Sequence, residues 1–256
     1  MTRTPSFEVH TKDDADAGTV LLGGIADIGA AGLTGIDYLV DHLETTQIGW
    51  VSTRNLPVVA PVSDGEPRHP IRLYSVNDTG ITILLSELFV PVPVAAPFVD
   101  AVLEWTNANG IGEITLVQGT PFPHSEDEHL VFHVGTEAYR RTHFTNESTA
   151  DIEALPGGVL DGVHAQILVR SLEETDPSVG VLTTPSHPPG PDIDAALRLL
   201  DALARLYEID VDEQELQARS EEMHRYYEEL AARLNVLQQN EQSVENRDFP
   251  ENRMYM

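Results

Sequence analysis

The glycine-rich segment from Gly24 to Gly35 is the part of the sequence that comes closest to a ligand-binding motif. Gly29, Gly32 and Gly35 follow an apolar run at regular spacing, as in loops that turn backbone N–H groups towards a phosphate. The order G-x-G-x-x-G of dinucleotide sites is absent. Glycines also let a helix start close to a strand. The segment therefore predicts either a ligand loop or a tight junction between a strand and a helix.

Histidines and acids gather in a second group that could bind a metal. It begins at His124, continues through acids to His129, and is followed by His133. Only His129 and His133 have the spacing of a helical H-x-x-x-H pair, and they run into a predicted strand. A solvated acidic loop explains the group equally well, and we expect no metal there.

Other common catalytic motifs are missing. The sequence has no cysteine, which excludes disulfides, thiolate catalysis and zinc–thiolate sites. It has no G-x-S-x-G nucleophile elbow, and its only lysine, Lys12, is not in a P-loop. Asp27, Asp37, Glu87 and Asp161 lie near predicted element ends, where α/β proteins often place their sites, although such acids are commonly caps or solvated surface. We expect no catalytic residue and no cofactor.

The composition is strongly acidic. Forty-two Asp and Glu residues oppose fifteen Lys and Arg residues, giving a formal charge of −27. Scattered acids with almost no lysine suggest adaptation to high salt, which screens their repulsion; an acidic protein of a low-salt cytoplasm is the alternative. Because no basic patch could neutralise phosphates, nucleic acid is not an expected partner.

Targeting and membrane signals are also absent from the pattern. The first residues have no apolar signal core, and no apolar run approaches the length that spans a bilayer. We therefore expect no membrane partner and a soluble, cytoplasmic protein.

Short apolar runs alternate with helical patterns, which predicts one α/β domain over residues 18–210 with helices on both faces of a sheet. Residues 1–17 are polar and are expected to be a flexible lead-in. Strands are expected at 19–25, 47–52, 71–76, 81–87, 113–118, 130–134 and 179–183. Helices are expected after Gly35, from an opening at Pro91–Pro97 that leads into Phe98, from about Asp161 to Arg170, and after a cap at Asp192 or Asp194.

A heptad stripe distinguishes the C-terminal part. Leu216, Met223, Leu230 and Leu237 are seven residues apart, which predicts a long helix within residues 211–239, about 40 Å in length. Such a helix could pack on its own domain or on a partner subunit, and the sequence leaves both open. Residues 240–256 are polar and are expected to form a flexible tail.

The glycine segment, read with its neighbours, resembles the start of the proteasome assembly chaperone family. Gly24, Asp27, Gly29, Gly32 and Gly35, with Tyr38-Leu39 after them, are similar to that family's G-F-P-D-A-G-L-V-G … Y-L pattern. Further similar motifs follow in the same order along residues 18–235: Ile83–Glu87, Ile114–Gly119, Gly157-Gly158 with Gly162, Pro191–Leu200 and Leu206–Asp212. The chain departs from the pattern at Ile25-Ala26, where the family usually has an aromatic residue and a proline.

The resemblance implies a three-layer αβα sandwich, similar to phosphorylase and hydrolase folds, and a homo-oligomer, here expected as a trimer or tetramer. It carries over no catalytic residue. It also gives meaning to the last three residues, Met254, Tyr255 and Met256, because several proteasome-binding proteins end in a hydrophobic residue, tyrosine and any residue. The implied function is binding of proteasome α-subunits through this tail, to aid core-particle assembly or to open the gate.

Two other functions stay open at the level of sequence. One is an enzyme of phosphorylase, hydrolase or carboxylate-ligase type, with a site at the strand ends near Gly29–Gly35 and Gly119. The other is an oligomeric scaffold whose tail is incidental.

Overall fold

A computed structural model of the chain describes residues 4–13, 15–121, 129–145, 147–173, 177–187 and 190–245. Within these residues the strands are β1 (Ser6–Thr11), β2 (Val20–Ile25), β3 (Thr45–Arg54), β4 (Val62–Ser63), β5 (Glu66–Pro67), β6 (Ile71–Val76), β7 (Ile81–Ser86), β8 (Glu113–Thr120), β9 (Phe132–Gly135), β10 (Glu153–Ala154) and β11 (Ser178–Pro185). The α-helices are α1 (Ala31–His42), α2 (Ala95–Ala108), α3 (Glu137–His143), α4 (Gly162–Glu173), α5 (Ile193–Tyr207) and α6 (Gln214–Glu245).

One mixed sheet forms the centre of the fold. Among the described residues it contains nine strands in the order β1-β3-β6-β7-β2-β8-β11-β9-β10, and β4 and β5 form a separate small hairpin. The central strands β7, β2, β8 and β11 are parallel. They are mostly apolar because both of their faces are covered, which is typical of parallel sheets.

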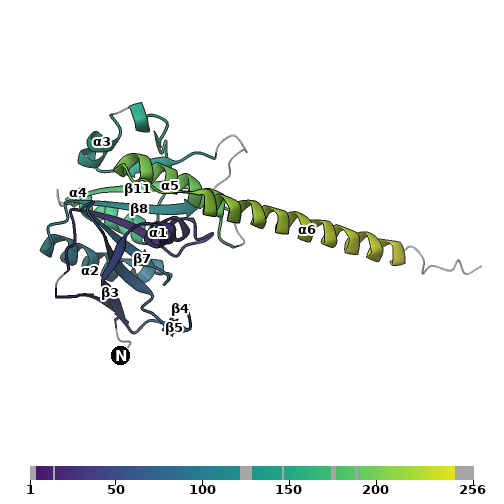
Figure 1. The fold of residues 1–256 in the computed structure, drawn as a ribbon, viewed down its shortest axis with the longest axis horizontal. Coiled ribbons are helices and arrows are strands. Elements are labelled where there is room, and N and C mark those ends of the chain that lie inside the picture. The colour runs from purple at the N-terminus through teal and green to yellow at the C-terminus, as the bar shows by residue number, and fades with distance from the viewer. Residues whose placement is uncertain are drawn as a thin grey trace, which may run out of the picture. The chain divides into compact units, whose positions relative to one another are not determined.

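Helices cover the two faces of this sheet, and they can be followed in Figure 1. On one face α1 packs against α5, and on the other α2 packs against α4. Side chains alternate between the faces along each strand. Thus Leu21 joins a buried cluster with Phe98 and Val102 of α2, whereas Gly24 of the same strand faces α1. The expected three-layer αβα architecture is confirmed.

The expected strands and helices are found in the described residues, but several details differ from the sequence prediction. The helix α1 begins at Ala31 rather than after Gly35, and β4, β5 and β10 were not predicted. Residues 6–11 are not a lead-in but the edge strand β1, which pairs with β3; their Phe7 is buried against Phe98 in an edge-on contact. Residues 240–245 belong to α6 rather than to a tail. The helix α3 was not predicted, because only Tyr139 among its residues is buried, which leaves no apolar period to detect.

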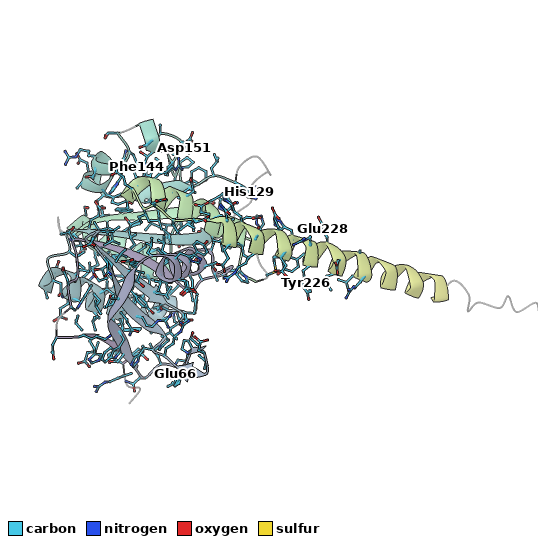
Figure 2. All side chains as sticks on the ribbon, viewed as in Figure 1. Glu66, His129, Phe144, Asp151, Tyr226 and Glu228 are labelled. Carbon is cyan, nitrogen blue, oxygen red and sulfur yellow. The ribbon has the colours of Figure 1, made fainter. Side chains whose placement is uncertain are left out.

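The chain divides into two compact units, residues 1–213 and 214–256. The second unit is described up to residue 245 and consists of α6, on which Tyr226 and Glu228 are labelled in Figure 2. No helix in the described part of the chain is both long and apolar enough to cross a membrane.

Candidate functional site

The carboxyl ends of β2 and β8 open onto a cavity of about 360 Å³. Open α/β sheets usually bind ligands at this edge, where the loops after neighbouring parallel strands diverge. The cavity is bounded by the loop after β2, the loop after β7, the end of β8 and the start of α4. The predicted residues Asp27 and Gly119 both line it.

The glycines of the segment 24–35 allow α1 to pack closely against its neighbours. A Cβ at Gly32 would lie 2.1 Å from the carbonyl oxygen of Val117, and one at Gly24 would lie 2.5 Å from the carbonyl oxygen of Gly32. Gly35 sits against Ala196 of α5. These glycines therefore let α1 lie directly on β2, β8 and α5, which is the junction reading of the segment rather than the ligand-loop reading.

Two further predicted glycines meet at Ser186, just after β11. A Cβ at Gly29 would lie 2.3 Å from Ser186 Oγ, and one at Gly119 would lie 2.5 Å from Ser186 Cβ. Gly29 also has a φ of +86°, a backbone conformation that residues other than glycine rarely adopt. The loops after β2, β8 and β11 can therefore pack closely together, because Gly29 and Gly119 have no side chain at the contact with Ser186.

The packing of these loops buries one ionisable group, the carboxyl group of Asp27. Its Oδ2 accepts a hydrogen bond of 3.2 Å from the backbone N–H of Gly119, while its Oδ1 is buried without a hydrogen-bond partner among the described residues. Burial raises the pKa of Asp27 to about 7, against the opposing effect of backbone hydrogen bonds from Gly119, Asp27 itself and Ala30. The carboxyl group therefore gains and loses a proton near neutral pH.

His164, in the first turn of α4, also lines the cavity. It is 6% exposed, and its ring forms a hydrogen bond with the backbone of Val117 in β8. Burial lowers the pKa of His164 to about 4, so the ring is neutral at pH 7. Its Nε2 is buried without a hydrogen-bond partner in the part of the chain that the structure describes. Sequence reasoning missed this residue, because a single histidine on a helix with apolar neighbours gives no signal of its own.

Asp161, another of the predicted acids, also lines this cavity, and the other predicted residues discussed next lie elsewhere. Gly157 and Gly158 line a neighbouring cavity of about 640 Å³, on the far side of Thr120, Pro121, Val159 and Leu160, which the two cavities share. Nothing lies within 4 Å of a Cβ built at Gly157. Met254, Tyr255 and Met256 are outside the described residues.

The histidine-rich group does not form a metal site in the part of the chain that is described. His124 and the acids 126–128 lie outside the described residues. His133 is buried in β9, where its Nδ1 is 3.0 Å from the carbonyl oxygen of Ile152 and its ring stacks on Phe144. This histidine is therefore a packed core residue.

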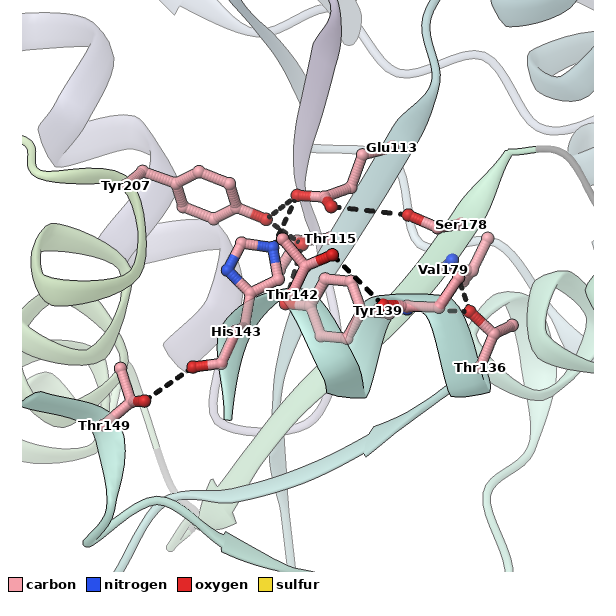
Figure 3. Close-up of polar contacts among 11 residues, drawn as sticks. Glu113, Thr115, Thr136, Tyr139, Thr142, His143, Thr149, Ser178, Val179 and Tyr207 are labelled. Carbon is pink, nitrogen blue, oxygen red and sulfur yellow. Dashed lines mark hydrogen bonds and ion pairs between the residues drawn. The ribbon is translucent and has the colours of Figure 1, made fainter. Parts of the chain in front are cut away.

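A buried polar network lies at the opposite ends of the same strands (Figure 3). Glu113, the first residue of β8, accepts hydrogen bonds from His143 Nε2 at 2.8 Å and from Tyr207 OH at 2.9 Å. Its other oxygen accepts a hydrogen bond from Ser178 at 3.3 Å. The hydroxyl group of Thr115 donates a hydrogen bond to the fully buried Tyr139 and forms another hydrogen bond with the hydroxyl group of Tyr207. The network joins α3 and α5 to the sheet.

The charge state of Glu113 follows from these contacts. Burial favours its neutral form, but the hydrogen bond and charge of His143, with hydrogen bonds from Tyr207 and Ser178, outweigh burial and lower the pKa of Glu113. Burial likewise raises the pKa of Tyr139 and of Tyr207 well above the usual tyrosine range. Since Glu113 does not line either cavity described above, we assign the network to stability.

The long helix α6 has an apolar stripe that is partly open to solvent. Tyr226, Leu230 and Leu234 are 60%, 39% and 51% exposed, and Leu230 belongs to the predicted heptad series. Exposed large apolar residues at helical spacing are typical of a helix that pairs with another surface.

Comparison with known proteins supports a single family. The model of the PAC2 family matches residues 21–231. The chain is similar in structure to Pyrococcus furiosus PbaA, described as an archaeal homolog of proteasome-assembly chaperone, with 17% identity, a TM-score of 0.77, and 94% of this chain and 100% of that chain covered. It is also similar to Pyrococcus furiosus PbaB, described as an archaeal proteasome activator, with 16% identity, a TM-score of 0.74, and 88% and 99% covered.

A Thermoplasma acidophilum protein of unknown function is a further similar structure, with 21% identity, a TM-score of 0.70, and 90% of this chain and 93% of that chain covered. No curated protein sequence matches the chain at a significant level. At these identities the structural likeness establishes the fold, and the family model establishes the relationship.

Proposed function

The chain belongs to the PAC2 family, and from this premise we propose that it is a non-enzymatic, proteasome-assembly-chaperone-like protein that binds α-subunits of the core proteasome. The observation that carries the proposal is the family match over residues 21–231. The fold shared with PbaA over the full length of that protein supports it. The likeness to PbaB, an activator, extends the proposal to gate opening as well as assembly.

The proposed contact is made by Met254, Tyr255 and Met256, the last three residues of the sequence. A terminal carboxylate can pair with a lysine, a tyrosine phenol can donate a hydrogen bond, and both methionines can bury apolar area. A tripeptide of this kind binds weakly by itself. Several copies presented by one oligomer would bind a ring of subunits with much higher avidity.

A homo-oligomer, in our proposal a trimer or tetramer, would supply those copies. The exposed stripe of α6, with Leu230 and Leu234 one helical turn apart, is the surface that we propose for pairing between copies. The cytoplasm is the proposed location, because it follows from the proposed partner. Adaptation to high salt is proposed from the charge of −27.

The cavity beside Asp27 favours a second candidate, an enzyme of phosphorylase, hydrolase or carboxylate-ligase type. A carboxyl group with a pKa of about 7 suits acid–base chemistry. However, the hydrogen bonds that the structure gives to Asp27 come from backbone N–H groups. Acyl or phosphoryl transfer also requires a group that stabilises the developing charge, and none of the described residues that line the cavity is lysine or arginine. We therefore place binding ahead of turnover.

The experiment is a pull-down of native proteasome α-subunits at high salt by the full chain, by a chain lacking residues 254–256, and by Tyr255→Ala. Phe249→Ala, which removes another aromatic ring of the same tail, is the control. We expect both changes within 254–256 to lose the α-subunits and the control to retain them. Equal recovery by all four proteins would overturn the role of the tail. Core-particle yield and peptidase rate, measured on the same samples, separate assembly from gate opening.

A further inference from the structure

The cavity beside Asp27 contains two buried hydrogen-bond acceptors that none of the residues described in the structure satisfies. Both Asp27 Oδ1 and His164 Nε2 are without a partner, and both residues line the same cavity. A buried acceptor left unpaired costs free energy, so native proteins usually supply a donor to each one. Two such atoms in one cavity indicate that the donor comes from a bound molecule.

The tautomer of His164 determines whether its Nε2 donates or accepts a hydrogen bond with a bound molecule. The ring is bonded to the backbone of Val117, and a backbone carbonyl of β8 can only accept, so that ring nitrogen carries the proton. In a neutral imidazole the other nitrogen is then an acceptor. Nε2 of His164 therefore requires an N–H or O–H from its partner.

Charge narrows the class of molecule further. Among the described residues that line the cavity, Asp27 and Asp161 are acidic and none is lysine or arginine. An anionic group would enter without a counter-ion and beside carboxylates, which is unfavourable in a partly buried site. The occupant is thus neutral or cationic.

The mouth of the cavity is apolar. Ile28, Phe89, Val92 and Val159 line it and are 58%, 57%, 56% and 92% exposed. Side chains of this kind gathered at the rim of a cavity mark a binding site more often than an ordinary surface. A volume of about 360 Å³ lies at the lower end of the range for small-molecule sites.

We propose that this cavity binds a small molecule with a compact apolar body and a hydrogen-bond-donating head group, neutral or cationic, whose donors reach Asp27 and His164. The apolar body contacts Phe89 and Val159 at the mouth. This site is separate from residues 254–256, so its occupancy and proteasome binding can be tested independently.

The test uses the full chain and three probes that share a phenyl ring: benzylamine, benzyl alcohol and benzoate. Binding is measured by ligand-observed NMR titration at constant salt and pH. We expect benzylamine and benzyl alcohol to bind saturably in the millimolar range, as suits fragments of this size, and benzoate to bind at least tenfold more weakly. Saturable binding of benzoate equal to that of benzylamine would overturn the proposal, as would the absence of saturable binding by all three.

Three variants locate the binding. Asp27→Asn keeps the shape of the side chain and removes its charge, and should weaken benzylamine at least tenfold. Phe89→Ala, at the exposed mouth, should weaken the binding of both benzylamine and benzyl alcohol severalfold, because it removes apolar contact and leaves Asp27 in place. Leu172→Ala removes another exposed apolar side chain, 79% exposed on α4 and outside the cavity lining, and should leave binding unchanged. Unchanged binding in both Asp27→Asn and Phe89→Ala would refute the site.

Discussion

The backbone N–H of Gly119 donates to the carboxyl group of Asp27 at 3.2 Å, and this contact joins the ends of two strands that are more than ninety residues apart in the chain. The carboxyl group of Asp27 is also largely buried at this place, and burial raises its pKa to about 7. The relationship makes Asp27 both a structural link and a group that titrates near neutrality.

The first prediction concerns the pH dependence of stability at Asp27. Because its pKa is raised on folding, the folded state retains a proton that the unfolded state loses, and the free energy of unfolding falls as the pH rises from about 4 to about 7. A shift of this size corresponds to at most ~4 kcal/mol. Asp27→Asn should therefore be more stable than the natural chain at pH 8, by an amount that shrinks towards pH 5.

Urea unfolding followed by circular dichroism between pH 5 and pH 8 measures this difference. Glu104→Gln, a change of an exposed acid on α2, is the control and should show no such trend. A difference between Asp27→Asn and the natural chain that stays constant over this range would contradict the prediction.

The second prediction concerns the packing of α1. Gly32→Ala would place a methyl group 2.1 Å from the carbonyl oxygen of Val117, which forces α1 away from β8. We expect a loss of ~1–3 kcal/mol in the free energy of unfolding, despite the higher helix propensity of alanine. Gly157→Ala is the matched control, since nothing lies within 4 Å of its added Cβ. Equal stability of the two variants would show that α1 is not packed so closely.

The third prediction concerns the network around Glu113. Glu113→Gln keeps the volume but removes the charge that His143 and Tyr207 bond, so we expect a loss of about 2 kcal/mol at pH 7. The pKa of Glu113 is lowered on folding; its contribution is therefore present above the ordinary glutamate pKa and is lost as the pH falls through the lowered value. This sign is opposite to that at Asp27.

Chemical unfolding of the Glu113→Gln protein at pH 7 gives the value. Glu137→Gln, on the surface of the neighbouring helix α3 with a contact of 3.6 Å to Arg141, should change stability by less than ~0.5 kcal/mol. A loss no greater than that of the control would mean that the network is not stabilising.

The fourth prediction concerns assembly through α6. Replacing Leu230 and Leu234 by glutamate puts two charges into the exposed apolar stripe and should convert the proposed oligomer to a monomer. Ala232→Glu changes an exposed position off the stripe and should leave the mass unchanged. Light scattering after size-exclusion chromatography reads the mass directly, and an oligomer that survives the double change must pair through another surface.

The fifth prediction concerns salt. A net charge of −27 repels itself in dilute buffer, whereas at 1 M salt the screening length falls to about 3 Å. We expect the melting temperature to rise by several degrees between 0.1 M and 2 M potassium chloride. Sucrose stabilises by exclusion from the surface without screening, so an equal rise in sucrose would point away from electrostatics.

Local sequence pattern was enough for most of the fold. The parallel strands were visible as short apolar runs, and α2 as Phe98, Val102 and Trp105 at helical spacing, all of which are buried. Asp192 caps α5 as one of the two predicted residues, with its Oδ1 accepting from the N–H of Ala195 at 2.9 Å. Where the pattern was weak it failed: β1 is a polar edge strand, and α3 buries only Tyr139.

The sequence by itself determined the α/β class, the acidic charge, the glycines of the α1 junction and the similarity to a family, because each of these depends on residue type and short spacing. Only the tertiary structure decided which polar groups meet. Asp27 lies beside Gly119, His164 beside Val117, and Glu113 beside Tyr207. Their hydrogen bonds and pKa values arise from burial between distant segments, and no local pattern encodes how deeply a carboxyl group or an imidazole will be buried.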